Sequence, residues 1–172
     1  KTASGIDQID IARPNERGTS YNRLSELQVS EQGLILNNNK YIVVDTEIAG
    51  LVARNRNLDN GQEANLIITE VTGKNQTNIN GYIEVAGKRA DIVIANRNGI
   101  IVNGGGFLNI SGATLTTGSL QMKNGDLVSI DIEEGMVKIG EKGVDASYLD
   151  YFEILSKTAD IAGIIKGGET TK

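Results

Sequence analysis

Residues 81–118 constrain the fold more than any other stretch of the chain. Their sequence is GYIEVAGKRADIVIANRNGIIVNGGGFLNISGATLTTG, in which four or five short apolar runs alternate with glycine and asparagine corners. Such short runs leave hardly any room for a helix, whereas β-branched residues bounded by turn residues are typical of strands. The stretch therefore predicts a series of short strands joined by tight corners.

The chain upstream of this stretch follows a similar pattern. Residues 6–11 predict a short strand that ends in a turn at Pro14-Asn15 and could cap a larger β structure by pairing with its first strand. Residues 21–29 fit neither period cleanly and favour an irregular or strand-like segment. The three asparagines at 37–39 indicate either a sharp corner or a surface loop, because asparagine tolerates left-handed backbone angles.

Three further segments lie between that asparagine run and residue 81. Residues 40–54 are apolar at successive positions, which predicts strands that are buried on both sides. The β-branched run at 66–71 predicts a strand. The polar residues 72–80 are interpreted as the tip of a hairpin that projects from the body.

Downstream of residue 118 the pattern of short apolar runs continues. Strands are expected at 119–123, 127–132 and 136–140. Asn124-Gly125 is a strong two-residue turn signal, so the first two of these strands form either a hairpin or successive parts of a coil. Residues 147–152 suggest a short irregular or helical turn, with strands after it.

Strands of this length without intervening helices leave a sandwich, a barrel or a parallel β-helix. Two observations favour the β-helix. The tripeptide Asn-Arg-Asn occurs at 55–57 and again at 96–98, a spacing that fits two coils of about 20 residues. The run Gly104–Gly106 suits a place where backbones approach closely.

Composition narrows the range of functions. The chain has no cysteine and no histidine, which excludes disulfides, thiolate or imidazole metal ligands and a Ser-His triad. The net charge of −5 and the aromatic content of 4% disfavour nucleic acid as a partner. With a single proline and no low-complexity linker, 172 residues predict one domain.

Two groups of charged residues are candidates for chemistry. Asp131 and Glu133 share a strand face by their spacing, with Asp126 and Glu134 nearby, and such carboxylates serve in glycoside cleavage or calcium binding, or simply face solvent. Lys88 and Arg89 with Asp91 could clamp an acidic sugar or form a surface ion pair. No phosphate-binding loop and no assembled active site is evident, so we expect neither an enzyme nor a cofactor or metal site.

Several blocks of the sequence together resemble a known family. The blocks are GLILNNN, ANLIITEV and the whole of residues 81–118, and the likeness extends from residues 9–22 to residues 141–161. They resemble the N-terminal secretion (TPS) domain of two-partner-secretion exoproteins, the family of filamentous haemagglutinin and contact-dependent growth inhibition toxins. The resemblance implies one domain over residues 1–172, an all-β right-handed parallel β-helix with an N-terminal cap and a small extra-helical hairpin or sheet.

The resemblance also implies a function and a place in the cell. Such a domain is recognised in the periplasm, after removal of a signal peptide, by the POTRA domains of a cognate outer-membrane TpsB transporter. It directs export of a large adhesin, haemolysin or inhibition toxin to the surface of a Gram-negative bacterium and templates the folding of the downstream chain. Host or neighbouring-cell surfaces are then partners of the full-length protein. A polysaccharide-acting enzyme and a direct host-surface adhesin are the alternatives.

The candidate partner-binding or structural turns are the two Asn-Arg-Asn motifs. They comprise Asn55, Arg56, Asn57 and Leu58, and Asn96, Arg97, Asn98 and Gly99. The family usually has proline where this chain has Arg56 and Arg97, and many relatives carry cysteines in the region of Val102 and Gly105. A type I turn accepts most residues at the second position, so we expect both turns to persist with some loss of rigidity.

Overall fold

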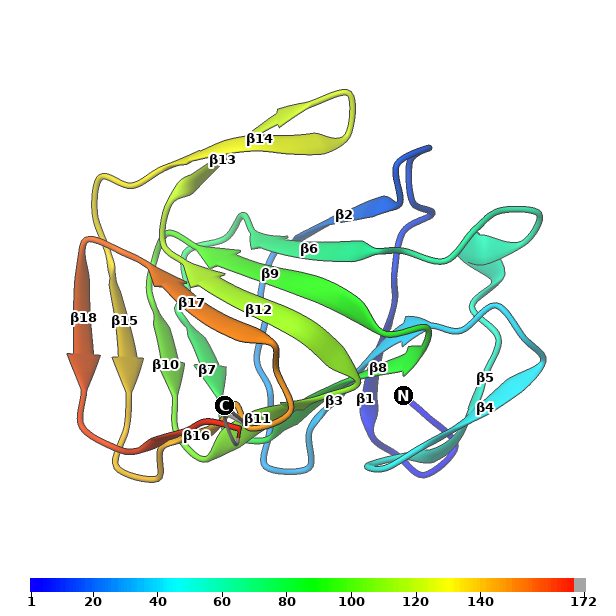
Figure 1. The fold of residues 1–172 in the computed structure, drawn as a ribbon, viewed down its shortest axis with the longest axis horizontal. Coiled ribbons are helices and arrows are strands. Elements are labelled where there is room, and N and C mark those ends of the chain that lie inside the picture. Colours follow the sequence, from blue (N-terminus) through cyan, green and yellow to red (C-terminus); the bar gives the residue numbers. More distant parts are fainter. Residues whose placement is uncertain (169–172) are drawn as a thin grey trace, which may run out of the picture.

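The computed structural model describes residues 1–168, which form three parallel sheets and two antiparallel hairpins (Figure 1). Sheet A contains β1 (Asp7–Asp10), β3 (Leu34–Asn38), β8 (Tyr82–Gly87), β11 (Gly105–Leu108), β16 (Val144–Asp145) and β19 (Ile165–Lys166). Sheet B contains β2 (Thr19–Leu24), β6 (Leu66–Val71), β9 (Ala90–Asn96), β12 (Ile110–Thr116) and β17 (Tyr151–Leu155). Sheet C contains β7 (Thr77–Ile79), β10 (Ile100–Val102), β15 (Met136–Ile139) and β18 (Thr158–Ile161).

The chain passes from sheet A to sheet B to sheet C and returns to sheet A one coil further along, as β8, β9, β10 and β11 do. Neighbouring strands within each sheet are parallel, and Ile92 pairs with Ala113, 21 residues later. This is a parallel β-helix, so the expected fold class is confirmed and the sandwich and barrel are excluded. Among the described residues, no helix is long and apolar enough to cross a membrane.

The core fills the space enclosed by the three sheets. Inward-facing side chains stack in columns, because the parallel register places equivalent positions of successive coils above one another. In sheet B one column runs from Ile67 through Ile92 and Ala113 to Phe152. The ring of Phe152 lies 5.8 Å from that of the fully buried Phe107 of sheet A.

The N-terminal end of this core is closed by polar side chains. β2 carries Ser20 beside Ile67 and Asn22 beside Thr69, and both polar residues are buried. The Ser20 hydroxyl donates to the Ala12 carbonyl (2.6 Å), while the Ala12 N–H donates to the Asn22 side chain (2.8 Å). The predicted strand over 6–11 is confirmed as β1, which pairs with β3.

Residues 40–54 correct one expectation. They are not strands buried on both sides but an antiparallel hairpin of β4 (Val43–Thr46) and β5 (Gly50–Ala53) outside the coils. One face packs on Ile35 and Ala86 of sheet A, while Val43 and Leu51 on the other are 49% and 63% exposed. An apolar run on successive positions did not distinguish a doubly buried strand from a hairpin with an exposed face.

Residues 72–80 correct a second expectation, because they do not project as a hairpin tip. Residues 77–79 of this segment form β7, which pairs in parallel with β10. Gly73 lies so close to the neighbouring coil that a Cβ atom would come within 2.1 Å of the Ser25 carbonyl oxygen. The polar residues therefore form a corner of the coil that packs against the preceding coil.

Of the two alternatives at Asn124-Gly125, a hairpin or successive parts of a coil, the structure has the hairpin. β13 (Ser119–Lys123) pairs in antiparallel fashion with β14 (Asp126–Asp131), and the hairpin is inserted between β12 and β15. The asparagine run at 37–39 is not a surface loop: all three side chains are buried and bonded to backbone carbonyls of neighbouring segments. Strands β17, β18 and β19 follow the turn near residue 149, as expected.

Candidate recognition corners and surface groove

The first Asn-Arg-Asn motif forms a corner of the N-terminal coils. Asn55 is fully buried and caps a short 3₁₀ helix, η1 (Arg56–Leu58), by accepting from the Asn57 N–H at 2.9 Å. Its amide nitrogen donates to the carbonyls of Ile11 and Asn37, both at 2.9 Å. Asn55 therefore joins three separate segments of backbone; both of its amide N–H donors are used, and its full burial keeps it out of reach of a partner.

The second motif follows β9. Asn96 is buried, accepts from the Asn98 N–H at 2.9 Å, and donates to the Asn75 carbonyl and the Thr77 hydroxyl, both at 2.9 Å. Asn98 adds a bond to the Gly73 carbonyl at 2.8 Å. Gly99 closes the turn with φ of +112°, a backbone conformation that side chains other than glycine rarely adopt.

The two motifs share this local geometry but not a position in the coil. Asn55 lies between β3 of sheet A and β6 of sheet B, whereas Asn96 lies between β9 of sheet B and β10 of sheet C. The two tripeptides are therefore not one corner of the coil repeated at a spacing of two coils. The common chemistry is that of an asparagine which bonds its own backbone two residues on.

Both arginines extend from these corners into solvent. Arg56 lies 3.9 Å from Asp59, and its side chain is 79% exposed. Arg97 is also exposed and lines a small pocket with Asp131, Glu133 and Glu134. Leu58, by contrast, is fully buried. Within each motif the first asparagine is buried, whereas the arginine and the second asparagine are exposed; the second asparagine bonds backbone of the domain, and the arginine extends into solvent.

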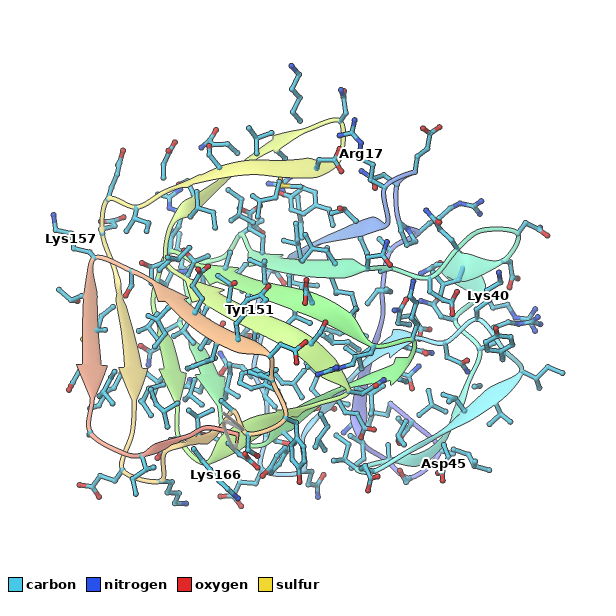
Figure 2. All side chains as sticks on the ribbon, viewed as in Figure 1. Arg17, Lys40, Asp45, Tyr151, Lys157 and Lys166 are labelled. Carbon is cyan, nitrogen blue, oxygen red and sulfur yellow. The ribbon has the colours of Figure 1, made fainter. Side chains whose placement is uncertain are left out.

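The predicted carboxylate group is divided: Asp131, Glu133 and Glu134 line the small pocket with Arg97, whereas Asp126 lies at the other end of β14. Asp131 and Glu133 are exposed, while Asp126 pairs with Arg17 at 2.6 Å and accepts from Asn15 at 2.7 Å. These bonds tie the tip of the β13–β14 hairpin to the N-terminal loop, near Arg17 in Figure 2. Within residues 1–168 no group of acidic side chains is arranged to hold a metal ion.

The second charged group does not form a clamp. Arg89 lies 3.7 Å from Asp150 and donates to the Tyr148 carbonyl at 3.0 Å, so its ion pair is not with Asp91. Asp91 instead accepts from the Ser111 hydroxyl at 2.7 Å. Lys88 donates to Asn65. The expected surface ion pair exists, with a different acidic partner.

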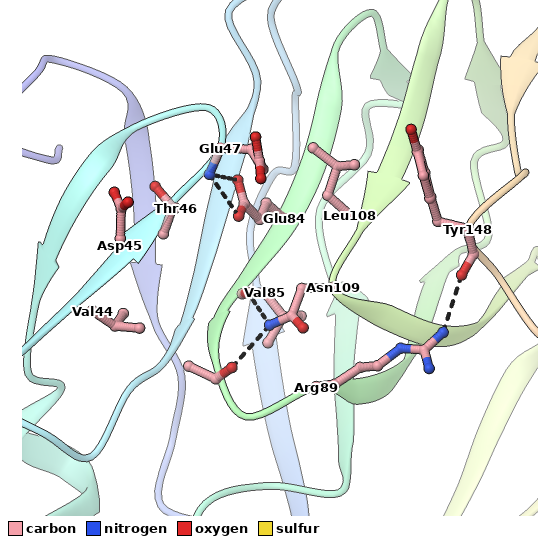
Figure 3. Close-up of a pocket in the computed structure, with 11 residues that line it drawn as sticks. Val44, Asp45, Thr46, Glu47, Glu84, Val85, Arg89, Leu108, Asn109 and Tyr148 are labelled. Carbon is pink, nitrogen blue, oxygen red and sulfur yellow. Dashed lines mark hydrogen bonds between the residues drawn. The ribbon is translucent and has the colours of Figure 1, made fainter.

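A groove of about 780 Å³ lies on the outer face of sheet A. No motif or pattern in the sequence predicted this groove. One wall is β4 with Asp45 and Thr46, and the other is formed by Arg89, Asn109 and Tyr148 (Figure 3). Glu84 and Leu108 lie between these walls.

Glu84 holds the β4–β5 hairpin against sheet A. Its side chain is buried and accepts from the backbone N–H groups of Glu47 (3.0 and 3.1 Å) and Ile48 (3.0 Å). A buried carboxylate requires such donors, since an unbonded one is strongly disfavoured. A glutamate inside the apolar run YIEVA was the available signal, because a charged residue at that position must find buried partners.

Two tyrosine–carboxylate pairs lie on the outer faces of the sheets. Tyr82 donates to Asp145 at 2.7 Å, and this bond, with burial, raises the pKa of Tyr82 to about 12. Burial and the bond to Glu70 likewise raise the pKa of Tyr21 to about 12. Burial alone would raise the pKa of Asp145, but bonds from Ser147 and Tyr82 outweigh it and lower that pKa. The Tyr21–Glu70 pair joins the adjacent strands β2 and β6, whereas the Tyr82–Asp145 pair spans β11 and links β8 to β16, two coils apart.

The fold and corners define a class: a parallel β-helix capped at its N-terminal end and carrying two extra-helical hairpins. Comparison with known proteins gives the family. A family model described as the TPS secretion domain matches residues 1–172, and the chain belongs to this family. Domains of this kind target exoproteins for secretion and work with a TpsB transporter partner.

Curated relatives support the same assignment. The chain is 43% identical over 162 residues to the 16S rRNA endonuclease CdiA of Enterobacter cloacae, covering 94% of this chain and 5% of that protein. It is 39% identical over 172 residues to a tRNA nuclease CdiA of Escherichia coli O6:K15:H31, covering 99% and 5%. The chain thus spans about a twentieth of the length of these relatives, and the nuclease names describe the full-length proteins.

A solved structure agrees with the fold. The crystal structure of the filamentous hemagglutinin secretion domain matches with a TM-score of 0.85 at 35% identity, covering 92% of this chain and 52% of that one. Exoproteins with TPS domains are secreted or cell-surface proteins of Gram-negative bacteria.

Proposed function

We propose that this domain is recognised in the periplasm by the POTRA domains of a cognate outer-membrane TpsB transporter, and that this recognition commits the exoprotein to export. The single observation that supports the proposal most strongly is the match of the TPS secretion domain along the whole chain. A preceding signal peptide would bring the chain into the periplasm. The parent would be an inhibition toxin, in keeping with the CdiA relatives, rather than a haemolysin or an adhesin.

Within this function the asparagines and the arginines of the two Asn-Arg-Asn corners have different roles. Asn55, Asn57, Asn96 and Asn98 bond backbone groups of the domain and hold its corners, with Leu58 buried and Gly99 completing the second turn. Arg56 and Arg97 are exposed and available to a partner. Replacement of an asparagine would therefore reduce export through loss of fold, and replacement of an arginine through loss of contact.

The C-terminal end of the domain supports a second role, as a template for the downstream chain. β17, β18 and β19 are the last strands of sheets B, C and A, respectively, among the described residues, and their outer edges pair with no other strand there. Phe152 and Ile154 continue the inner columns of sheet B and are only partly buried. A following coil would pair with these edges and cover these side chains.

Co-expression tests the targeting function. The 172-residue chain, produced in the periplasm with and without the transporter, is expected in the medium only when the transporter is present. A transporter that lacks its POTRA domains provides the control for recognition. Folded domain that stays in the periplasm beside an intact cognate transporter, and that does not bind isolated POTRA domains, would contradict the proposal.

A further inference from the structure

The β4–β5 hairpin has one edge bound to the body and one edge open. The Ala53 carbonyl accepts from Asn37 at 2.9 Å and the Ala49 carbonyl from Ser4 at 2.9 Å, so β5 faces the body. The Arg54 N–H donates to the Ile42 carbonyl at 3.1 Å, which identifies residues 42 and 54 as a hydrogen-bonded pair.

The hydrogen-bonding pattern then defines the open edge. Antiparallel pairs alternate between bonded and non-bonded, so the pairs formed by Val43 with Ala53 and by Asp45 with Leu51 are non-bonded. The backbone N–H and C=O groups of Val43 and Asp45 therefore point away from β5. Within residues 1–168 no hydrogen bond is made to these groups. An edge of this kind is a template for an added strand.

This open strand borders the groove described above. Val44, Asp45 and Thr46 line one side, and the opposite wall lies beyond Glu84 and Leu108 (Figure 3). A strand added to β4 would lie about 4.8 Å from it. The added strand would then run along the groove, with alternate side chains directed toward Leu108 and toward Tyr148, which is 60% exposed.

The charged side chains that line the groove determine which kind of segment it attracts. Asp45 and Glu47 are exposed at the hairpin side of the groove. Arg89, the cation of the groove, is bonded to the Ile110 and Tyr148 carbonyls and lies near Asp150. Two exposed carboxylates thus face a cation that is already paired, and the groove attracts a basic segment.

We propose that an extended, basic segment of the transporter's periplasmic POTRA domains binds in this groove as an additional strand on β4. The inference rests on the proposed function, which it deepens by assigning the surface of this domain that the transporter contacts. Backbone bonds to Val43 and Asp45 supply affinity, while Asp45 and Glu47 select basic side chains.

The test measures binding of the 172-residue chain to purified POTRA domains of the cognate transporter. Asp45→Pro removes an outward N–H and places a ring in the path of an added strand without breaking the β4–β5 bonds. Loss of this backbone hydrogen bond, together with obstruction of the added strand by the proline ring, predicts an affinity at least about tenfold lower. Ala53→Pro is the matched control, because its N–H lies on the edge of the same hairpin that faces the body, and binding should remain within about twofold.

A charge pair of variants separates local from global electrostatics. The double variant Asp45→Lys/Glu47→Lys and the control Glu16→Lys/Glu141→Lys both change the net charge from −5 to −1, and the two control residues are exposed and line neither the groove nor the pocket beside Arg97. Only the first is expected to weaken binding, and the loss should be largest at low salt. Melting temperatures establish that each variant is folded.

The outcomes separate this inference from the proposed function. Binding of the wild-type chain together with unchanged binding of Asp45→Pro and of the first double variant would overturn the groove assignment and leave transporter recognition standing. A concentration-dependent dimer that only Asp45→Pro abolishes, with POTRA binding unchanged, would assign the edge to self-pairing and also overturn it. Absence of POTRA binding by the folded wild-type chain would remove the proposed function itself.

Discussion

The two ends of the β-helix are built differently. At the N-terminal end, sheet B begins with Ser20 and Asn22 in the inner columns, and their polar groups are bonded to Ala12 and to each other. At the C-terminal end, the same columns finish with Phe152 and Ile154, which are only partly covered. Ile161 and Ile164 near the last strands are 53% and 79% exposed.

The difference between the two ends bears on where a further coil could stack on the domain. A polar first layer that satisfies its own hydrogen bonds offers no apolar surface on which another coil could stack. An apolar last layer with unpaired strand edges needs one, since such edges otherwise invite aggregation. We therefore propose that the domain is closed at its N-terminal end and accepts the downstream chain at its C-terminal end. The predictions below test that contrast.

The largest effect is expected from comparing two phenylalanines that contact each other. Phe107 lies fully buried in sheet A, whereas Phe152 lies in the last strand of sheet B. Phe107→Ala should lower the free energy of unfolding by about 3–5 kcal/mol. Phe152→Ala should cost less than half as much, because its site is partly open to water. Chemical denaturation measures both, and equal losses would show that the C-terminal layer is closed after all.

A smaller loss is expected at the closed end from Asn55. Asn55→Ala removes one donor from each of the carbonyls of Ile11 and Asn37, of which Ile11 keeps the bond from Asn57, and it removes the cap of η1, at a cost of about 2–3 kcal/mol. The exposed neighbour provides the control, and Arg56→Ala should change stability by less than about 0.5 kcal/mol. If Asn55→Ala proved as mild as the control, the corner would not be held in the way described.

High pH should weaken the hydrogen bonds that Tyr21 and Tyr82 donate to carboxylates of other coils. Tyr21 and Tyr82 have pKa values raised to about 12, compared with 10.0 unfolded, so the fold favours their neutral form. Their contribution to stability is complete below pH 10 and is lost as the pH rises from 10 toward about 12. Tyr21→Phe should flatten part of the fall in melting temperature over that interval. An unchanged pH profile in this variant would refute the assignment of Tyr21.

The smallest expected change is a gain. Arg56 is the first residue of η1, a position where proline is well tolerated, because its φ angle is preset for a helical turn. Arg56→Pro should raise the free energy of unfolding by about 0.4–1 kcal/mol, since the unfolded chain loses freedom. A loss of stability would mean that the backbone at Arg56 does not suit proline. POTRA binding of the same variant reports separately whether the arginine contributes to recognition.

Much of the fold could be predicted from sequence, because its signals are local. Short β-branched runs predicted the strands, and Asn124-Gly125 indicated the hairpin as one of two alternatives. The resemblance to the TPS family gave the coil architecture. Residues 40–54 were misjudged for a physical reason: an apolar run does not reveal whether one of its faces is covered.

The surface features depend on contacts between residues far apart in the sequence, and they were therefore harder to predict from the sequence. The asparagines of the two motifs were identified as turn residues, but their bonds to Ile11, Asn37 and Asn75 span neighbouring coils. Arg89 finds Asp150, 61 positions away, instead of the nearby Asp91. The groove arises only when the β4–β5 hairpin folds back on sheet A, an arrangement that depends on the buried Glu84.

Amide hydrogen exchange tests the difference between the two ends most directly. In the 172-residue chain, we predict slow exchange of the amides of β2 and β6 and markedly faster exchange in β17, β18 and β19. Extension of the chain by the next coil of its exoprotein should slow exchange in those last strands and leave β2 unchanged. Equal protection at both ends, or no response of the last strands to the extension, would contradict a domain that is closed at its beginning and open at its end.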